Sequence, residues 1–138
     1  GSRNAMQQAL NEASISLEQV DYINTHGTST PIGDVAEVKA IQDLFGKHAY
    51  NISLTSSKSM MGHLLGGSGA VEAIISLLSM QHSMVTPTIN HEEGDEDPKI
   101  DYKLNFTFNQ AQSRDIHYAM SNNFGFGGHN ACLLFKKL

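Results

Sequence analysis

The segment from Ala70 to Met80 constrains the fold more strongly than any other part of this 138-residue sequence. Its apolar residues would cover almost the whole circumference of a helix, which leaves only a narrow polar line along one side. That line consists of Ser68, Glu72, Ser76 and Ser79. We expect such a helix to be buried on nearly all sides, and it predicts a layered domain in which some helices lie between sheets.

Helical and strand patterns alternate along the rest of the chain, which predicts an α/β domain. An amphipathic helix is expected over residues 4–13. Another is expected to begin with Asp34 as its cap, to present Val38 and Ile41 on its apolar face, and to stop at Gly46.

Strand patterns occupy five segments of the sequence. Two short strands are expected over residues 20–23 and 52–55, and the first of these should be buried. Apolar and polar residues alternate weakly over residues 102–108, as in an edge strand. This segment follows a solvated acidic loop over residues 91–99. The last two strands, over 116–120 and 131–135, should be joined by a glycine-rich loop.

The overall composition excludes several classes of protein. A chain of 138 residues with 40% hydrophobic content fits one domain with a real core. A net charge of −5 without a basic stripe argues against nucleic acid as a partner. No apolar run approaches the length of a membrane span, and the one cysteine, Cys132, cannot form an internal disulfide. We therefore expect a reducing, cytoplasmic compartment and no membrane.

Three polar or glycine-rich segments follow predicted strands, over residues 24–30, 56–63 and 124–130. Sites in open α/β sheets gather at the carboxyl ends of strands, so these segments could converge. His26 lies in a loop of small hydroxyl residues that could hold an imidazole, although a capping or exposed histidine fits the pattern as well. His63 comes just before a helix start, where the helix dipole should keep it a neutral donor.

A possible ion pair joins two of these elements. Glu72 belongs to the nearly all-apolar helix, and a buried carboxylate needs a partner because an isolated charge is costly in a low dielectric. Lys58, on the preceding loop, is the best candidate, and two unrelated surface charges are the alternative.

Two other kinds of site are rejected. Gly125, Gly127 and Gly128 resemble a phosphate-binding turn, but the loop joins two strands and no helix follows it to supply a dipole. The histidines show no metal-ligand spacing and the single cysteine excludes a zinc ribbon, so no metal is expected. The simplest role for Cys132 is that of a small core residue.

Several motifs run in order along nearly the whole chain. They are HGTSTP at 26–31 with Gly33 and Asp34, SKSM at 57–60, GHLLG at 62–66, GAVE at 69–72, and NFGFGG at 123–128 with Asn130. Together they resemble the β-ketoacyl-acyl-carrier-protein synthases, the condensing enzymes of fatty acid synthesis, and are most similar to the elongating synthases of the type II bacterial system.

The resemblance implies a thiolase-like fold, in which two similar halves stack as αβαβα layers and the working form is a homodimer. Residues 1–138 would be the C-terminal half, beginning after its first strand, and the N-terminal half with the nucleophilic cysteine would be absent. The family topology that we infer places the missing strand centrally. Two strand edges would then be exposed, unless another chain or a rearrangement fills the gap.

The resemblance also implies roles for individual residues. His26 and His63 would drive decarboxylation of malonyl-acyl-carrier-protein, with Lys58 and Glu72 holding the network around them. Thr28 and Thr30 would contact the phosphopantetheine arm. Phe126, together with Gly125, Gly127 and Gly128, would form the gate of the acyl pocket. Asn130 would be a supporting residue. His129 stands where many relatives have threonine, which leaves the gate intact.

The function that follows is decarboxylative Claisen condensation in fatty acid elongation, with acyl carrier protein as partner and no cofactor. The fragment alone should be inactive, since Cys132 lies in the last strand and cannot replace the nucleophile.

A freestanding polyketide ketosynthase is the first alternative; the chain end just past the final strand argues against a multidomain megasynthase. A noncatalytic partner like a chain-length factor is the second, although both histidines and the lysine are retained. A degradative thiolase is disfavoured because its second catalytic cysteine motif is missing.

Overall fold

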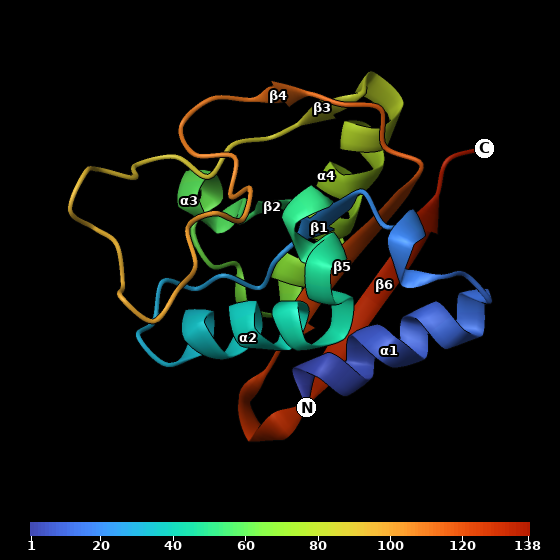
Figure 1. Cartoon of the computed structure of the whole chain (residues 1–138), viewed down its shortest axis with the longest axis horizontal. Helices are drawn as coiled ribbons and strands as arrows, with labels where there is room; N and C mark the ends of the chain where they lie inside the picture. The colour runs from blue at the N-terminus through green and yellow to red at the C-terminus, as the bar shows by residue number, and fades with distance from the viewer.

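The computed structural model describes residues 1–138 except for the side chain of Phe126. Its centre is a four-stranded sheet in the order β2-β1-β5-β6 (Figure 1). The strands are β1 (Tyr22–Asn24), β2 (Ser53–Thr55), β5 (Tyr118–Phe124) and β6 (Asn130–Lys136). β1 pairs in parallel with both β2 and β5, and β6 runs antiparallel to β5. The predicted α/β class and the final hairpin are therefore confirmed.

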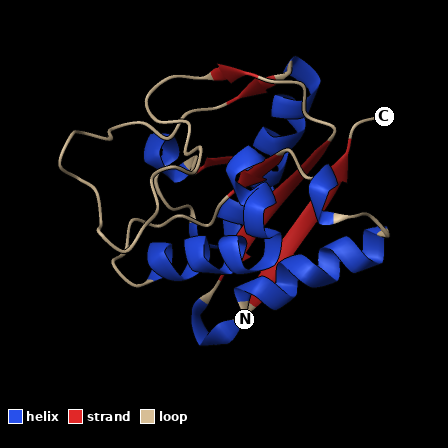
Figure 2. Cartoon of the chain, viewed as in Figure 1, coloured by secondary structure: helices blue, strands red, loops and turns tan.

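Helices cover both faces of this sheet, as the colouring in Figure 2 makes clear. On one face, α1 (Ser2–Ala13) and α2 (Gly33–Phe45) pack with Ile23, Leu54 and Met120 of the sheet into the larger core cluster. On the other face, α4 (Ser68–His82) contributes Met80 to a smaller cluster with Tyr22 and Ala119. Burial of these apolar side chains is the main driving force that holds the three layers together.

Short elements complete the chain. A two-stranded antiparallel ribbon, β3 (Met84–Val85) with β4 (Gln112–Ser113), follows α4, and the sequence pattern did not indicate it. α3 (Lys58–Met61) follows β2. The remaining elements are four 3₁₀ turns: η1 (Leu17–Gln19), η2 (Gly46–Asn51), η3 (Leu65–Gly67) and η4 (Phe126–Gly128). None of the helices among the described residues combines the length and the apolar character that a membrane crossing requires.

Two local predictions are wrong. Asp34 is not the cap of α2, because the N-cap is Ile32; the Asp34 carboxylate lies inside the first turn and accepts the Ser29 N–H at 3.2 Å. Residues 102–108 form no strand, because a turn in which the Leu104 N–H donates to the Asp101 carbonyl oxygen begins the segment and Thr107 takes a positive φ of 49° near its end. Asn105 still lies along the outer edge of β2, where its carbonyl oxygen accepts the Leu54 N–H at 2.7 Å.

The expected break in the middle of the sheet is absent from the described residues. β1 pairs directly with β5, from Tyr22 opposite Ala119 to Asn24 opposite Ser121. Each strand of this pair satisfies the hydrogen bonds of its neighbour, so the space between them holds no further strand. The expectation that a missing strand is central to this sheet is therefore wrong.

Helix α4 buries its polar side and exposes its apolar side in this chain. Its polar line, Ser68, Glu72, Ser76 and Ser79, is buried against the sheet. Its apolar residues Ile74, Leu77 and Leu78 are 56%, 47% and 46% exposed. Within the described residues no other element covers this apolar face, so in this chain by itself α4 is an outer layer, and its burial on nearly all sides stays a prediction for the longer protein.

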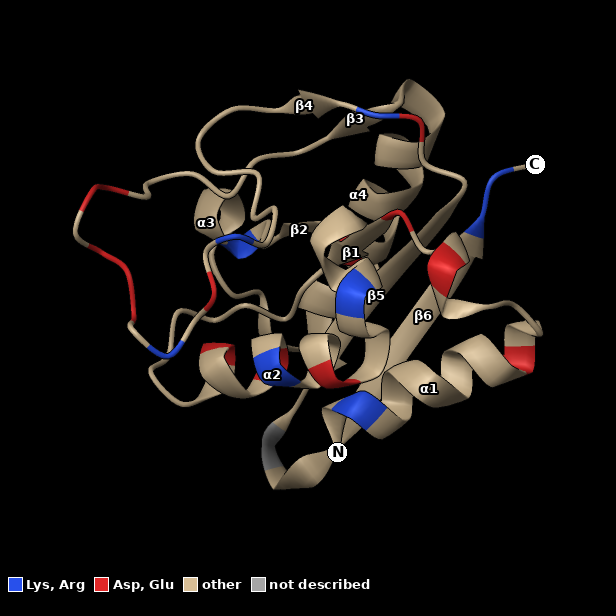
Figure 3. Cartoon of the chain, viewed as in Figure 1, with Lys and Arg blue, Asp and Glu red and all other residues tan. Residues whose placement is uncertain are grey.

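The charged residues also segregate. The loop with Glu92, Glu93, Asp95, Glu96 and Asp97 projects from the side of the molecule, away from α4 (Figure 3). It lacks regular strand or helix structure and is largely exposed, which confirms the predicted solvated loop.

Two matched substitutions test this arrangement. Ile41→Ala, in the core at 0% exposure, should destabilise the chain by about 2–5 kcal/mol through the cavity it leaves. Ile74→Ala, on the exposed face of α4, should cost less than about 1 kcal/mol. Urea unfolding of the 138-residue chain measures both free energies. Equal losses would contradict the orientation of α4 described above.

Candidate active site

The loops that follow β1, β2 and β5 meet at one edge of the sheet, because these three strands are parallel and end on the same side. The rings of His26 and His63 lie edge to face with centroids 5.6 Å apart. The ring of Phe124, at the end of β5, lies 5.9 Å from that of His26. The structure therefore brings both predicted histidines together, as the convergence of the loops predicted.

A cavity of about 840 Å³ opens beside these loops. Its near wall contains Thr28, Thr30, Lys58 and His63. Its far wall is aromatic, because His91, Tyr102, Phe106 and Phe108 stack against one another, with the His91 and Phe108 rings 3.8 Å apart. The size of the cavity is in the range of small-molecule sites.

His63 is held in one tautomer. Its Nδ1 accepts the Leu65 N–H at 3.0 Å and lies 3.2 Å from Ser68 Oγ, at the start of α4. A ring nitrogen that accepts a backbone N–H carries no proton, so in the neutral imidazole the proton resides on Nε2. In that tautomer His63 presents an N–H donor at Nε2.

His26 is kept neutral by its surroundings. Burial, together with the smaller effects of the nearby Lys58 and His63, lowers the pKa of His26 to about 4. Its Nδ1 is buried and has no hydrogen-bond partner among the described residues. At pH 7 the imidazole is therefore neutral, with one ring nitrogen as a hydrogen-bond donor and the other as an acceptor.

The predicted ion pair is present. Lys58 Nζ donates to Glu72 Oε1, and the two side chains are 6% and 1% exposed. Burial raises the pKa of Glu72, and the hydrogen bond and charge of Lys58 oppose that rise. Asn123 Nδ2 lies 3.5 Å from the other carboxylate oxygen. The pair thus ties α3 to α4 and β5 beneath His63.

Glu37 is a site residue that sequence reasoning missed. It is buried on α2, and its carboxylate accepts the N–H groups of His26 and Gly27, both at 2.9 Å. Burial raises the pKa of Glu37, whereas these two hydrogen bonds lower it. One signal was available: Glu37 lies four residues before Ile41, so it shares the buried face of the helix.

The predicted carrier-arm residues line the cavity. Thr28 Oγ1 and Thr30 Oγ1 lie 3.2 Å apart. A Cβ atom added to Gly33 would come within 2.4 Å of Thr30 Oγ1, so the glycine leaves room for that hydroxyl. Asp34 keeps the loop in place through Ser29.

The predicted gate loop turns between β5 and β6. Gly127 and Gly128 have φ angles of 78° and 82°, which favour glycine, whereas Gly125 is extended. The Phe126 side chain lies outside the described residues, so its gating role stays a prediction. Asn130 begins β6 and borders a shallow hollow beside the loop, apart from the Lys58 and Glu72 pair.

Cys132 lies on β6 and packs against the larger core cluster. Burial raises the pKa of the Cys132 thiol to about 12, so it is a protonated thiol at pH 7 and a poor nucleophile. This agrees with a structural role. Among the described residues no group of three histidine, cysteine or acidic side chains could hold a metal ion.

The pKa of His26 is directly measurable. NMR titration of the ring resonances should give a value of about 4 in place of the ordinary 6.5, with His26→Ala used for assignment. Between these two pH values the unfolded chain binds a proton that the folded chain excludes, so stability should fall as pH falls through this window. A measured pKa near 6.5 would contradict the burial of the ring.

The Lys58 and Glu72 pair can be tested by a double-mutant cycle. Lys58→Met alone leaves a buried carboxylate without its cation and should destabilise the chain by about 3–5 kcal/mol. Adding Glu72→Leu removes that carboxylate and should restore much of the loss. Chemical denaturation of each variant gives the free energies; a double variant no more stable than Lys58→Met would exclude the coupling.

Known proteins provide an independent comparison. A family model described as "Beta-ketoacyl synthase, C-terminal domain" matches residues 1–92. The chain is 53% identical over 137 residues to the 3-oxoacyl-[acyl-carrier-protein] synthase 2 of Staphylococcus aureus (strain COL) and 47% identical to that of Synechocystis sp. (strain PCC 6803). Both matches cover 99% of this chain and 32% of the relative. The chain therefore spans about one third of the length of these curated relatives.

Solved structures show the same fold. A β-ketoacyl synthase from Burkholderia phymatum STM815 is 40% identical and superposes with a TM-score of 0.90 over 99% of this chain and 32% of that one. A type II polyketide ketosynthase, solved in complex with its acyl-carrier protein, is 33% identical with a TM-score of 0.92 over the same shares. The chain belongs to the β-ketoacyl synthases, and it carries the C-terminal domain of that family's thiolase-like fold.

Proposed function

We propose that the protein containing this chain elongates fatty acids by decarboxylative Claisen condensation of an acyl thioester with malonyl-acyl-carrier-protein. The observation that carries the proposal is the pair of histidines, whose rings lie 5.6 Å apart in a chain of the β-ketoacyl synthase family. The relatives named 3-oxoacyl-[acyl-carrier-protein] synthase 2 support this substrate class, at 53% and 47% identity. In this proposal the chain supplies the half of the active site that binds the malonyl group.

The chemistry suits the two imidazoles. When the malonyl thioester loses CO2, its C–C bond breaks and the electron pair moves onto the thioester oxygen as an enolate. His63 Nε2–H and a neutral His26 can both donate hydrogen bonds to that oxygen, and such donors act as an oxyanion hole does. The enolate carbon then attacks the acyl carbonyl held on the nucleophile, which releases the cysteine thiolate.

Other residues have supporting roles in this reaction. Lys58, paired with Glu72, holds the network beneath His63 and does not act as a base. Thr28 and Thr30, which line the cavity, would bind the phosphopantetheine arm of the carrier, so no separate cofactor is needed. Phe126 would gate the acyl chain.

The nucleophile must come from outside this chain. The protonated Cys132 cannot serve, and the chain covers only 32% of its relatives. The exposed face of α4, with Ile74, Leu77 and Leu78, offers an apolar surface on which an N-terminal half could pack. We propose that this half brings the nucleophilic cysteine, that the complete enzyme is a cytoplasmic homodimer, and that acyl carrier protein is its partner, as for the polyketide ketosynthase solved with its carrier.

A polyketide ketosynthase is the second candidate. The structures that superpose with this chain include a type II polyketide ketosynthase, with a TM-score of 0.92, and the ishigamide ketosynthase/chain length factor, with a TM-score of 0.90, both at 33% identity. The products separate the two: a fatty acid synthase extends fully reduced acyl chains, whereas a polyketide enzyme accumulates unreduced keto groups.

A condensation assay on the full-length enzyme tests the proposal. His26→Ala should lower the rate of malonyl-acyl-carrier-protein decarboxylation and condensation about 100-fold to 1000-fold, as for loss of an oxyanion donor. His117→Ala is the matched control, because His117 is exposed and precedes β5 at the opposite end from the site. The 138-residue chain alone should show no turnover. Turnover by this chain, or a fully active His26→Ala enzyme, would overturn the assignment.

A further inference from the structure

We propose that residues 88–109 form a pH-sensitive strap over the cavity, which closes when His91 is protonated between Phe108 and Glu96 and loosens when His91 is neutral. The strap lies between β3 and β4 in the chain, and its aromatic residues form the far wall of the cavity, opposite the loop after β1. The strap goes beyond the proposed reaction and does not depend on it, because only contacts within this chain open or close it.

The two ends of the strap are fastened to each other. The Thr88 N–H donates to the Thr107 carbonyl oxygen at 3.1 Å, and the Asn109 N–H donates to the Thr88 carbonyl oxygen at 2.8 Å. The His91 N–H donates to Asn109 Oδ1 at 3.1 Å, and Asn109 Nδ2 donates to the His91 carbonyl oxygen at 2.8 Å. His91 is therefore fixed at the base of the strap.

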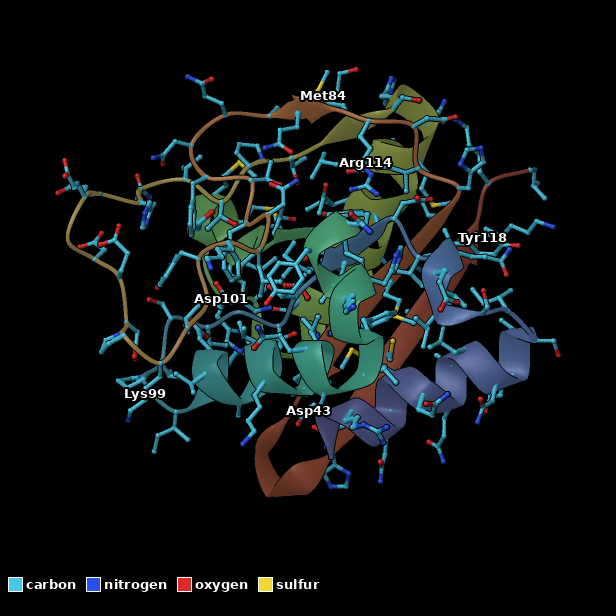
Figure 4. The ribbon with its side chains drawn as sticks, viewed as in Figure 1. Asp43, Met84, Lys99, Asp101, Arg114 and Tyr118 are labelled. Carbon is cyan, nitrogen blue, oxygen red and sulfur yellow. The ribbon has the colours of Figure 1, made fainter. Side chains whose placement is uncertain are left out.

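The projecting part of the strap is an acidic turn, residues 92–99. Its backbone N–H groups donate to acceptors within the strap itself. Lys99 marks the end of the turn, and Asp101 marks the place where the chain returns toward the body of the molecule (Figure 4). There the Tyr50 hydroxyl donates to Asp101 Oδ2 at 2.7 Å. The acidic turn thus lies between two fixed points, so side-chain contacts decide how closely it stays against the cavity.

Glu96 connects this turn back to His91. Its Oε1 lies 3.7 Å from His91 Nε2, and the side chains of His91 and Glu96 are 21% and 43% exposed. The two form an ion pair only when the imidazole carries a proton. When His91 is neutral, the carboxylates of the turn lose the cation that attracts them.

The stacking of His91 on Phe108 also suits the protonated ring. The ring centroids lie 3.8 Å apart and the ring planes differ by 13°. Two neutral aromatic rings prefer an offset or edge-to-face arrangement, with centroids about 4.5–7 Å apart. A cation over the face of a phenyl ring is attracted by the negative charge of that face. The stack and the contact with Glu96 are independent of each other, and both favour the imidazolium.

The other charges around the cavity do not reverse this preference. Asp95 and Asp97 of the turn line the same cavity, and their negative charges attract the imidazolium. Lys58 and His63 lie on the opposite wall, and Lys58 is neutralised by its ion pair. The titratable groups that line the cavity together with His91 are Asp34, Glu37, Lys58, His63, Asp95, Asp97 and Tyr102.

The direction of the pH effect follows from the charge of the imidazole. Histidine is the side chain that ordinarily changes its charge between about pH 5 and pH 8. The two contacts that need the proton are present at the acidic end of this range and are lost as the pH rises through it. The strap should therefore be more ordered at about pH 5.5, where ordinary carboxylates are still ionised, than at about pH 8.

Two variants remove the switch in different ways. Glu96→Gln removes the charge and keeps an oxygen for the Gly94 N–H, which Glu96 Oε2 accepts at 2.9 Å. His91→Phe keeps an aromatic ring on Phe108 and carries no proton at any pH. Glu93→Gln is the matched control, because Glu93 is exposed on the same turn and its loss changes the net charge of the turn by the same amount.

Hydrogen–deuterium exchange of the full-length enzyme measures how often the strap opens, with mass spectrometry of peptides from residues 92–103. Each variant is compared with wild type at the same pH, so the intrinsic pH dependence of exchange cancels. At about pH 5.5, Glu96→Gln should exchange about twofold to fivefold faster than wild type, and His91→Phe about threefold to tenfold faster. At about pH 8 both should match wild type, and Glu93→Gln should match it at both pH values.

Two results overturn the proposal. The first is wild-type exchange in Glu96→Gln or His91→Phe at the acidic pH. The second is an acceleration that is as large at the alkaline pH, because it would come from a contact that needs no proton. Thermal unfolding verifies that each variant is folded, and either variant decides the question if the other does not fold.

Discussion

Two carboxylates must be buried for this chain to fold around its site, and the rest of the arrangement depends on how each is satisfied. Glu72 and Glu37 lie on helices that cover opposite faces of the sheet, α4 and α2. Glu72 has a cation, Lys58, whereas Glu37 has only N–H donors. A buried charge without either kind of partner would cost several kcal/mol, on the order of the whole stability of a small domain.

Strand β5 contributes one side chain to each of these two carboxylates. Side chains alternate across a strand, so the neighbours Asn122 and Asn123 point to opposite faces. Asn122 donates to Glu37 at 3.1 Å, and Asn123 lies 3.5 Å from Glu72. Through this alternation, β5 contacts Glu37, which holds the His26 backbone on one face of the sheet. On the other face it contacts the ion pair of Lys58 with Glu72 near His63. The two histidines are thus supported from different layers, although their rings lie together.

The exposed apolar face of α4 follows from the same constraint. Because the polar line of α4 must reach Lys58 and the sheet, the apolar residues Ile74, Leu77 and Leu78 are turned outward. In the sequence, the apolar circumference indicated burial on all sides, and the direction of each face was undetermined. Periodicity reports how much of a helix is apolar, and it does not report which side meets which neighbour.

The sequence by itself determined four features. The α/β class and the glycine-rich hairpin follow from local patterns of apolar residues and glycines. The ion pair of Lys58 with Glu72 follows from the cost of an unpaired buried charge, and the convergence of His26 with His63 follows from the order of strands and motifs. Only the tertiary structure decided the direct pairing of β1 with β5, the inward polar face of α4 and the hydrogen bonds of the buried Glu37. Each of these depends on groups that are distant in the chain, such as Glu37 and Asn122, and sequence spacing carries no information about which such groups meet.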